Sequence, residues 1–151
     1  MMRPLSVFCS YSHKDERWRQ RLEVSLSQLH RDGIFRLWHD RRILPGIEWA
    51  ESIDEHLEAA DVILILVSAD FLTSEYCMGK EVTHAMERHE AGAARVVPVI
   101  ARPCDWHTAP FGKLQALPPE GKPLQGAGSD TRLTTVAQGL RVLASHLAGK
   151  S

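Results

Sequence analysis

The chain has 151 residues, of which 44% are hydrophobic and 25% charged, a composition typical of a single globular domain with its own core. A net charge of -1 gives no global field to attract nucleic acid or an anionic membrane. No apolar run reaches bilayer length, and the N-terminus has no long apolar signal region. Three scattered cysteines form no disulfide framework, and eight histidines form no recognisable metal set. We therefore expect a cytoplasmic protein with reduced thiols, no metal, no direct nucleic-acid contact and no membrane contact.

Five short segments predict strands. The central one, Val62–Val67, is an unbroken run of six apolar residues, which is typical of a strand buried on both faces of a parallel sheet. Pro98, inside another segment, cannot donate to a ladder and indicates a bulge or a sheet edge. The predicted strands are Leu5–Cys9, Phe35–Trp38, Asp61–Ser68, Arg95–Ala101 and a very short Lys122–Leu124.

The segments between and after these strands predict helices. Residues 15–30 carry one apolar stripe spaced at four, four and three (Trp18, Leu22, Leu26, Leu29), and Asp32-Gly33 ends it. A loop at 69–73 is predicted to precede a helix at 74–89. The other predicted helices are one through Trp49, Ile53 and Leu57, a short one at 111–117, and a last one capped by Ser129 or Asp130 with Leu133, Val136, Leu140, Leu143 and Leu147 on one face.

Strands that alternate with helices imply right-handed crossovers and a parallel sheet covered on both faces. The simplest arrangement is a single α/β domain over 1–151 with a flavodoxin-like three-layer fold, a five-stranded parallel sheet in the order 2-1-3-4-5. Such sheets bind ligands beyond the carboxyl ends of their strands, at the switch point between the first and third strands. This topology predicts that Ser10, Tyr11 and Ser68 meet the N-terminal half of the third helix.

Glu81 is the first candidate for chemistry. On a helical wheel it lies roughly 75° from the centre of the apolar stripe of the third helix, which is a half-buried border position. Such a carboxylate is directed along the sheet edge, where an active site would lie. By periodicity alone, however, a solvated or lysine-paired glutamate is the favoured interpretation.

The loop at 39–46 is the second candidate. Asp40, Arg41 and Arg42 precede Pro45-Gly46, and guanidinium groups fork onto phosphate oxygens. An exposed basic loop that docks a partner fits the same spacing equally well. Trp49 begins an apolar helical stripe, so core packing is its favoured role.

Three other interpretations are weaker. The stretch 126–129 lacks the full pattern of a glycine-rich phosphate loop. Cys77 lies near a helix N-terminus, but no histidine is placed by the sequence to activate it, so packing or lining a site is favoured. A phosphorelay receiver is excluded, because no acidic pair follows the first strand and Ser68 stands where the third strand would end in aspartate.

Four blocks of sequence occur in order at distinctive spacings. They are Val7–Ser12 with Asp15; Trp38–Asp40 through Leu44-Pro45-Gly46 to Trp49 and Ile53; Leu64–Ser68 with Phe71-Leu72, Ser74, Tyr76-Cys77 and Glu81; and 87–90, 98–106 and 111–118. With these blocks the chain resembles a bacterial-type Toll/interleukin-1 receptor (TIR) domain over nearly its whole length.

The resemblance implies the flavodoxin-like fold and one of two activities. Many TIR domains are NAD+ nucleosidases, which hydrolyse the nicotinamide–ribose bond and release linear or cyclic ADP-ribose. They need no metal and no cofactor, since NAD+ is the substrate. Their essential glutamate on the third helix matches Glu81. Other TIR domains only associate with further TIR domains, as scaffold or virulence modules.

The resemblance also implies a substrate site. Ser10 and Tyr11 would line the ribose and nicotinamide, Arg41 or Arg42 would hold the diphosphate, and Trp49 would shape the pocket, with Asp40, Ser68 and Cys77 completing it. The residue four positions before the glutamate is often tryptophan in TIR enzymes. It is Cys77 here, beside Tyr76, a departure that concerns the ring-stacking wall rather than the glutamate.

Assembly is the expected mode of activation. In the family, the loop matching Asp40–Gly46 contacts a neighbouring subunit and completes the site, so we expect a homo-oligomer or filament as the active form. The resemblance is also consistent with an effector domain that belongs with a downstream or separate sensor module in bacterial anti-phage defence.

Overall fold

The computed structural model describes residues 4–39 and 55–148. They contain one parallel sheet of four strands in the order β2-β1-β3-β4. This confirms the predicted order for the first four strands. The strands are β1 Leu5–Tyr11, β2 Phe35–His39, β3 Val62–Val67 and β4 Arg95–Ile100.

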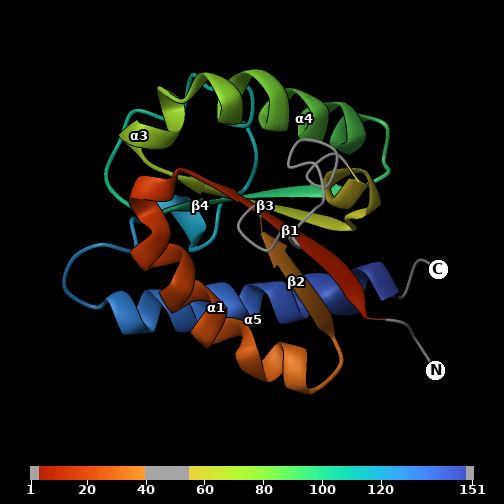
Figure 1. Cartoon of the computed structure of the whole chain (residues 1–151). Coiled ribbons are helices and arrows are strands. Elements are labelled where there is room, and N and C mark those ends of the chain that lie inside the picture. Colours follow the sequence, from red (N-terminus) through yellow and green to blue (C-terminus); the bar gives the residue numbers. More distant parts are fainter. Residues whose placement is uncertain (1–3, 40–54, 149–151) are drawn as a thin grey trace, which may run out of the picture.

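Helices cover both faces of the sheet, which confirms the flavodoxin-like three-layer architecture (Figure 1). Two long helices, α1 and α5, lie on one face, and the helical segments α3, η2 and α4 lie on the other. Within the described ranges, no helix is long and apolar enough to cross a membrane. In chain order the helical segments are η1 His13–Asp15, α1 Glu16–Arg31, residues 55–59, α3 Ala69–Leu72, η2 Cys77–Val82, α4 Thr83–Glu90, η3 Pro119–Gly121 and α5 Ser129–Ala148.

The central strand β3 is buried on both faces, as its composition predicts, and every residue in it is 0% exposed. Val62, Leu64 and Leu66 pack in the core beneath α1 and α5. The alternate residues Ile63, Ile65 and Val67 pack beneath η2 and α4. Each fully buried aliphatic side chain contributes roughly 1.5–3 kcal/mol, so this strand holds the two halves of the core together.

The first helix follows its predicted stripe. Trp18, Leu22, Leu26 and Leu29 are all buried against the sheet. A short turn, η1, precedes the helix where the sequence predicts its first residue. Gly33 follows it with a φ of 74°, a left-handed conformation that glycine adopts readily.

The proline in β4 marks a sheet edge rather than a bulge. Pro98 pairs with Ile65 in an unbroken register. Its carbonyl accepts a hydrogen bond of 2.9 Å from the Leu117 N–H, on the side of the strand away from β3. An edge position tolerates the missing proline N–H, because no ladder bond is lost there.

The fifth strand at Lys122–Leu124 is a wrong prediction for the described chain. The N–H groups of Leu124 and Gln125 bond to the carbonyls of Ile100 and Ala101, at 2.8 and 3.0 Å, but no strand forms. The ladder cannot extend toward the start of β4, because the Pro98 carbonyl already accepts from Leu117.

The short helix at 111–117 is also wrong. The segment forms turns in which Phe111 is 0% exposed and packs edge-on against Phe71, with ring centroids 6.3 Å apart. Its apolar residues are therefore held by tertiary packing rather than by a helical ladder.

The third helix forms close to its predicted position, from residue 75 to residue 90. The loop predicted before it contains the single-turn helix α3 instead. Ser68 caps this turn, because its hydroxyl accepts a hydrogen bond of 3.1 Å from the Phe71 N–H. The part of the third helix at Cys77–Val82 is a π-helix.

Candidate active site

A buried hydrogen bond joins β1 to η2 at the carboxyl edge of the sheet. The Ser10 hydroxyl donates to Glu81 Oε1 across 2.8 Å. Both residues are 1% exposed, although 71 positions separate them in the sequence. A hydrogen bond to a carboxylate is stronger than one between neutral groups, so this contact fixes the direction of the Glu81 side chain.

Strand alternation directs Ser10 toward Glu81. Phe8, two residues earlier, packs in the core beneath η2 and α4, and Ser10 follows it on the same face of β1. The sequence predicts Ser10 in a loop, but β1 extends through Tyr11, so the serine is held by the sheet ladder opposite Ile65.

The half-buried border position predicted for Glu81 is wrong, because the carboxylate is almost completely buried. A wheel of 100° per residue assumes α-helical geometry, whereas Glu81 lies in the π-helix. Its neighbours Cys77 and Val82 are buried in the core on the same side.

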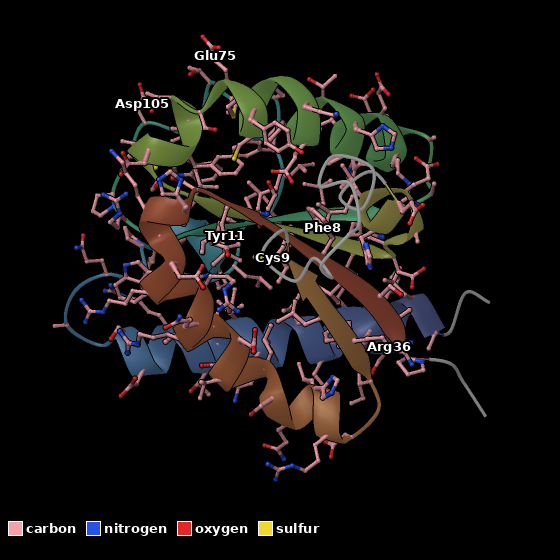
Figure 2. All side chains as sticks on the ribbon, in the orientation of Figure 1. Phe8, Cys9, Tyr11, Arg36, Glu75 and Asp105 are labelled. Atoms are coloured by element: carbon pink, nitrogen blue, oxygen red, sulfur yellow. The ribbon has the colours of Figure 1, made fainter. Side chains whose placement is uncertain are left out.

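Cys77 and Tyr11 contact each other through the Tyr11 backbone. The Cys77 thiol donates to the Tyr11 carbonyl across 3.7 Å, so Cys77 lies beside the end of β1. The Tyr11 ring packs on the opposite face of the sheet (Figure 2), with the Arg19 guanidinium 5.9 Å from its centre. The structure therefore brings Ser10, Cys77 and Glu81 together on one face, whereas Tyr11 reaches that face only with its backbone.

Ser68 belongs to a second cluster at the same edge. It is 0% exposed, and its hydroxyl makes a short hydrogen bond to Asp15 Oδ2. The other oxygen of Asp15 accepts from Arg102 Nε at 2.8 Å. Arg102 also donates to Asp70, on the helix that Ser68 caps, and Lys14 lies 3.7 Å from Asp70.

The charges of this cluster stabilise one another. The hydrogen bonds that Arg102 donates to Asp15 and Asp70 raise its pKa above the ordinary value. The hydrogen bond from Arg102, with the charge of Lys14, lowers the pKa of Asp70. Two cations thus balance two carboxylates, and the cluster ties together the chain segments that follow β1, β3 and β4.

Neither Asp15 nor Arg102 was predicted as a site residue. Asp15 directly precedes α1 and has the residue type of an N-cap, yet its side chain makes no cap hydrogen bond. Arg102 follows β4 as Ser68 follows β3. Parallel strands end at the same edge of the sheet, so the position of Arg102 directly after β4 was enough to predict it at this edge.

Four predicted site residues, Asp40, Arg41, Arg42 and Trp49, lie outside the described residues. In the ranges that are described, no group of three or more His, Cys, Asp or Glu side chains could hold a metal ion.

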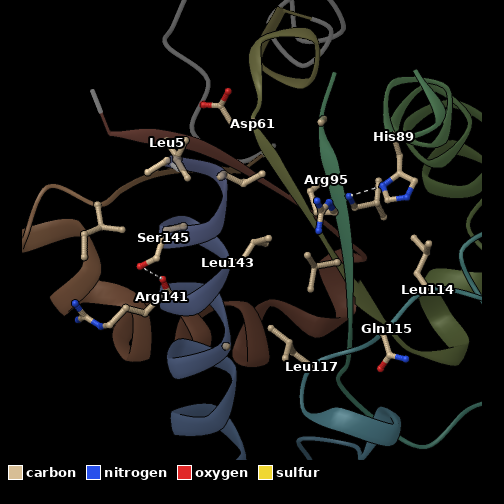
Figure 3. Close-up of a pocket in the computed structure, with 18 of the residues that line it drawn as sticks. Leu5, Asp61, His89, Arg95, Leu114, Gln115, Leu117, Arg141, Leu143 and Ser145 are labelled. Carbon is tan, nitrogen blue, oxygen red and sulfur yellow. Dashed lines mark hydrogen bonds between the residues drawn. The ribbon is translucent and has the colours of Figure 1, made fainter. Parts of the chain in front are cut away.

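A separate groove lies at the other end of the sheet, where the strands begin. Leu5, Asp61 and Arg95 line it together with residues of α5 and of the segment 114–117 (Figure 3). Ser10, Ser68, Cys77 and Glu81 do not line it. The groove and the Ser10–Glu81 site are therefore different places on the molecule.

Solved structures share this fold. The TIR domain of the Toll-related receptor TRR-2 from Hydra magnipapillata superposes with a TM-score of 0.61 at 21% identity, covering 89% of this chain and 94% of that one. The TIR domains of the activated Roq1 resistosome give 0.54 at 20% identity, over 64% of this chain and 57% of theirs. A prokaryotic SEFIR domain gives 0.55 at 16% identity, over 89% and 90%.

The sequence comparisons agree with the fold. The uncharacterized protein y4lF of Sinorhizobium fredii is 50% identical over 143 residues, which are 94% of this chain but 44% of that protein. The chain thus spans less than half the length of this relative. The family model of the TIR domain matches residues 7–122. With the parallel sheet and its flanking helices, this match shows that the chain belongs to the TIR domain family.

Proposed function

We propose that this chain is an NAD+ glycohydrolase that cleaves the nicotinamide–ribose bond and is activated when TIR domains assemble. The observation that carries the proposal is the buried Ser10–Glu81 pair at the carboxyl edge of the central strands. Ligands of doubly wound sheets bind at this edge, and a buried carboxylate whose direction is fixed there by a hydrogen bond is suited to chemistry.

The reaction needs one well-placed carboxylate. Nicotinamide leaves as a neutral molecule with the electron pair of the glycosidic bond, and positive charge develops on the ribose. Glu81 would stabilise that charge and hold the ribose hydroxyls, and Ser10 would fix the orientation of Glu81. Water then adds to the ribose carbon and loses a proton, which gives ADP-ribose. Attack by an adenine nitrogen instead of water gives the cyclic product.

Other residues would complete the substrate site. Cys77 is buried in the same helical segment as Glu81 and would form part of the wall against the nicotinamide ring. Ser68 and the Tyr11 backbone would bound the site at the strand ends. By the family resemblance, Arg41 or Arg42 would hold the diphosphate, Trp49 would shape the pocket and Asp40 would complete it.

Burial of the glutamate supports activation by assembly. Glu81 is 1% exposed in the single chain, so a ribose reaches its carboxylate only when the segments that cover it shift. Contact between TIR domains could supply that shift. The Roq1 TIR domains, which share the fold, were solved within an activated resistosome. We therefore propose a homo-oligomer or filament as the active form.

The test is product analysis on concentrated or crowded protein incubated with NAD+. Nicotinamide and ADP-ribose, linear or cyclic, are separated by mass spectrometry for the wild type, Glu81→Gln and Glu87→Gln. Glu87 is an exposed glutamate on the next turn and is the matched control. We expect the first variant to lose activity at least 100-fold, since a transition-state carboxylate is removed, and the control to keep it. Unchanged turnover in Glu81→Gln would refute the assigned role.

The alternative function is a scaffold or virulence module that binds other TIR domains without catalysis. It predicts no NAD+ loss under any assembly condition, together with partner capture that fails when Pro45 is changed. A role in anti-phage defence, with a sensor module, rests on the family resemblance. It predicts that bacteria expressing the wild type, but not Glu81→Gln, lose NAD+ and stop phage growth on infection.

A further inference from the structure

The third helix changes its geometry where it carries Glu81. Residues 75–76 and α4 are α-helical, but the six residues of η2 between them form a π-helix. A π-helical turn closes its hydrogen bonds from residue i to i+5 and so holds one more residue than an α-helical turn. Such turns are rare, and they occur frequently at functional sites.

The first residues of the wide turn are fixed to the end of β1 and to the preceding loop. The Cys77 thiol bonds to the Tyr11 carbonyl. The Ser74 hydroxyl accepts from the Cys77 N–H at 3.2 Å, and the Ser74 carbonyl accepts from the Met78 N–H at 2.9 Å. This half of the helix cannot rotate without breaking these three bonds.

The last residue of the wide turn and the residues of α4 after it are fixed by the core. Val82, Ala85 and Met86 are 1%, 0% and 7% exposed and pack with Phe8 beneath the sheet. Rotation of this half would move these apolar side chains into water, which is unfavourable. Both halves are therefore anchored independently, and Glu81 lies between the anchors.

We propose that the extra residue of this π-helical turn is the device that seats Glu81 against Ser10. One residue corresponds to about 100° of rotation in an α-helix. Without the extra residue, the two anchored halves would be out of phase by about that angle, and the carboxylate between them could not meet the serine while both anchors hold. The wide turn lets both anchors and the Ser10–Glu81 hydrogen bond form in the same structure.

Gly79 is the position that supplies the extra residue at least cost. It is exposed, and a methyl group added there would meet nothing within 4 Å. Its removal therefore shortens the turn without deleting any packed side chain. The Thr83 hydroxyl lies 3.4 Å from the Met78 carbonyl, five residues earlier, and gives this turn an additional hydrogen bond across its wide spacing.

The test compares deletion of Gly79 with Gly79→Ala, which keeps the residue count. A double-mutant cycle with Ser10→Ala and Glu81→Gln, followed by chemical denaturation, measures the coupling of the two residues without reference to activity. We expect a coupling of about fivefold or more in the unfolding constant for the full-length and Gly79→Ala chains, and none after the deletion. Retained coupling after the deletion overturns the proposal.

A second arm uses activity, and it rests on the proposed function. If the wild type cleaves NAD+, the deletion should lower kcat about 100-fold, as Glu81→Gln does, while Gly79→Ala stays within about threefold. If no chain cleaves NAD+ but the coupling is present and is lost on deletion, the proposed function fails and the positioning role stands.

A third variant covers the case in which the deletion does not fold. Insertion of one alanine after Gly79 rotates the halves in the opposite sense and should also abolish the coupling. If circular dichroism shows that deletion and insertion both unfold the chain while Gly79→Ala folds normally, the residue count serves the fold as a whole and the specific role in seating Glu81 is overturned.

Discussion

The guanidinium of Arg102 donates from Nε to Asp15 Oδ1 across 2.8 Å and so joins the segment after β4 to the turn after β1. Asp15 is 1% exposed, and its other oxygen accepts from Ser68 at the end of β3. One buried carboxylate therefore links the ends of three strands at the edge where the candidate site lies. The loss of either partner would leave a polar group buried without its charge-assisted bond.

Asp15→Asn should destabilise the fold by about 2–4 kcal/mol, because it removes the charge that accepts from Arg102 and Ser68. Chemical denaturation measures this free energy of unfolding. Arg102→Lys should lower the free energy of unfolding by a smaller amount. It keeps the positive charge but loses the planar guanidinium group that reaches both carboxylates. The matched control is Asp130→Asn, which alters a pair with Arg21 whose aspartate side chain is 96% exposed. A loss in Asp15→Asn no larger than in this control would contradict the structural role.

If the chain cleaves NAD+ as proposed, Ser10→Ala should lower kcat more than it changes KM. The serine hydroxyl donates to Glu81, so under that proposal its loss frees the orientation of the carboxylate without removing a substrate contact. We expect a fall in kcat of about 10-fold, smaller than for Glu81→Gln. Ser10→Thr keeps a hydroxyl donor and should restore part of the rate. A change confined to KM would mean that Ser10 binds substrate directly instead of orienting Glu81.

His89 makes stability depend on pH. Its Nδ1 accepts a hydrogen bond of 3.1 Å from the Val96 N–H, which requires the neutral ring (Figure 3). Burial lowers the pKa of His89 from its ordinary value of 6.5, the charges of Arg95 and Lys113 lower it further, and Glu90 opposes them. The unfolded chain therefore binds a proton at a higher pH than the folded chain does.

The stability contributed by neutral His89 is fully present above pH 6.5 and is lost as the pH falls from there toward the lower folded pKa. The Tm measured in buffers between pH 8 and pH 5, an interval of about three units centred on the ordinary histidine pKa, should fall on the acid side. His89→Asn should flatten that part of the profile. His146→Asn, at an exposed position of α5, is the control for replacing a histidine by asparagine. If the Tm falls equally steeply with pH in the wild type and in His89→Asn, the pH dependence of stability does not originate in His89.

The sequence predicted the elements whose signal is local. The apolar run of Val62–Val67 marks a central strand, and the spacing of Trp18, Leu22, Leu26 and Leu29 marks a buried helical face. The prediction of a helix at 111–117 was wrong. Phe111, Leu114 and Leu117 repeat every three residues, a spacing that also occurs on one face of a helix. The structure uses Phe111 to pack against Phe71 and the Leu117 N–H to pair with Pro98.

The candidate site was predicted in outline, since the topology and the resemblance both bring Ser10 and Glu81 to one edge. The burial of Glu81 could not be derived, because a helical wheel has no means of representing a π-helical turn. Asp15 and Arg102 are 87 residues apart, and an ion pair between such distant segments leaves no periodic pattern in either. The direction of the Tyr11 side chain was also not predicted. Tyr11 follows Ser10 in the strand, so its ring points to the opposite face of the sheet.

Gly112→Ala should destabilise the fold by about 2–3 kcal/mol. A methyl group at this position would lie 2.1 Å from the His107 carbonyl oxygen and 2.9 Å from that of Trp106. Both are backbone atoms, so no rotamer change relieves the clash, and the turn that seats Phe111 in the core has to move. Gly79→Ala is the matched control, because nothing lies within 4 Å of its added methyl group. It should leave stability unchanged or raise it by up to about 1 kcal/mol through helix propensity. Equal free energies of unfolding for the two variants would show that the turn at 107–112 adjusts to the methyl group without loss of stability.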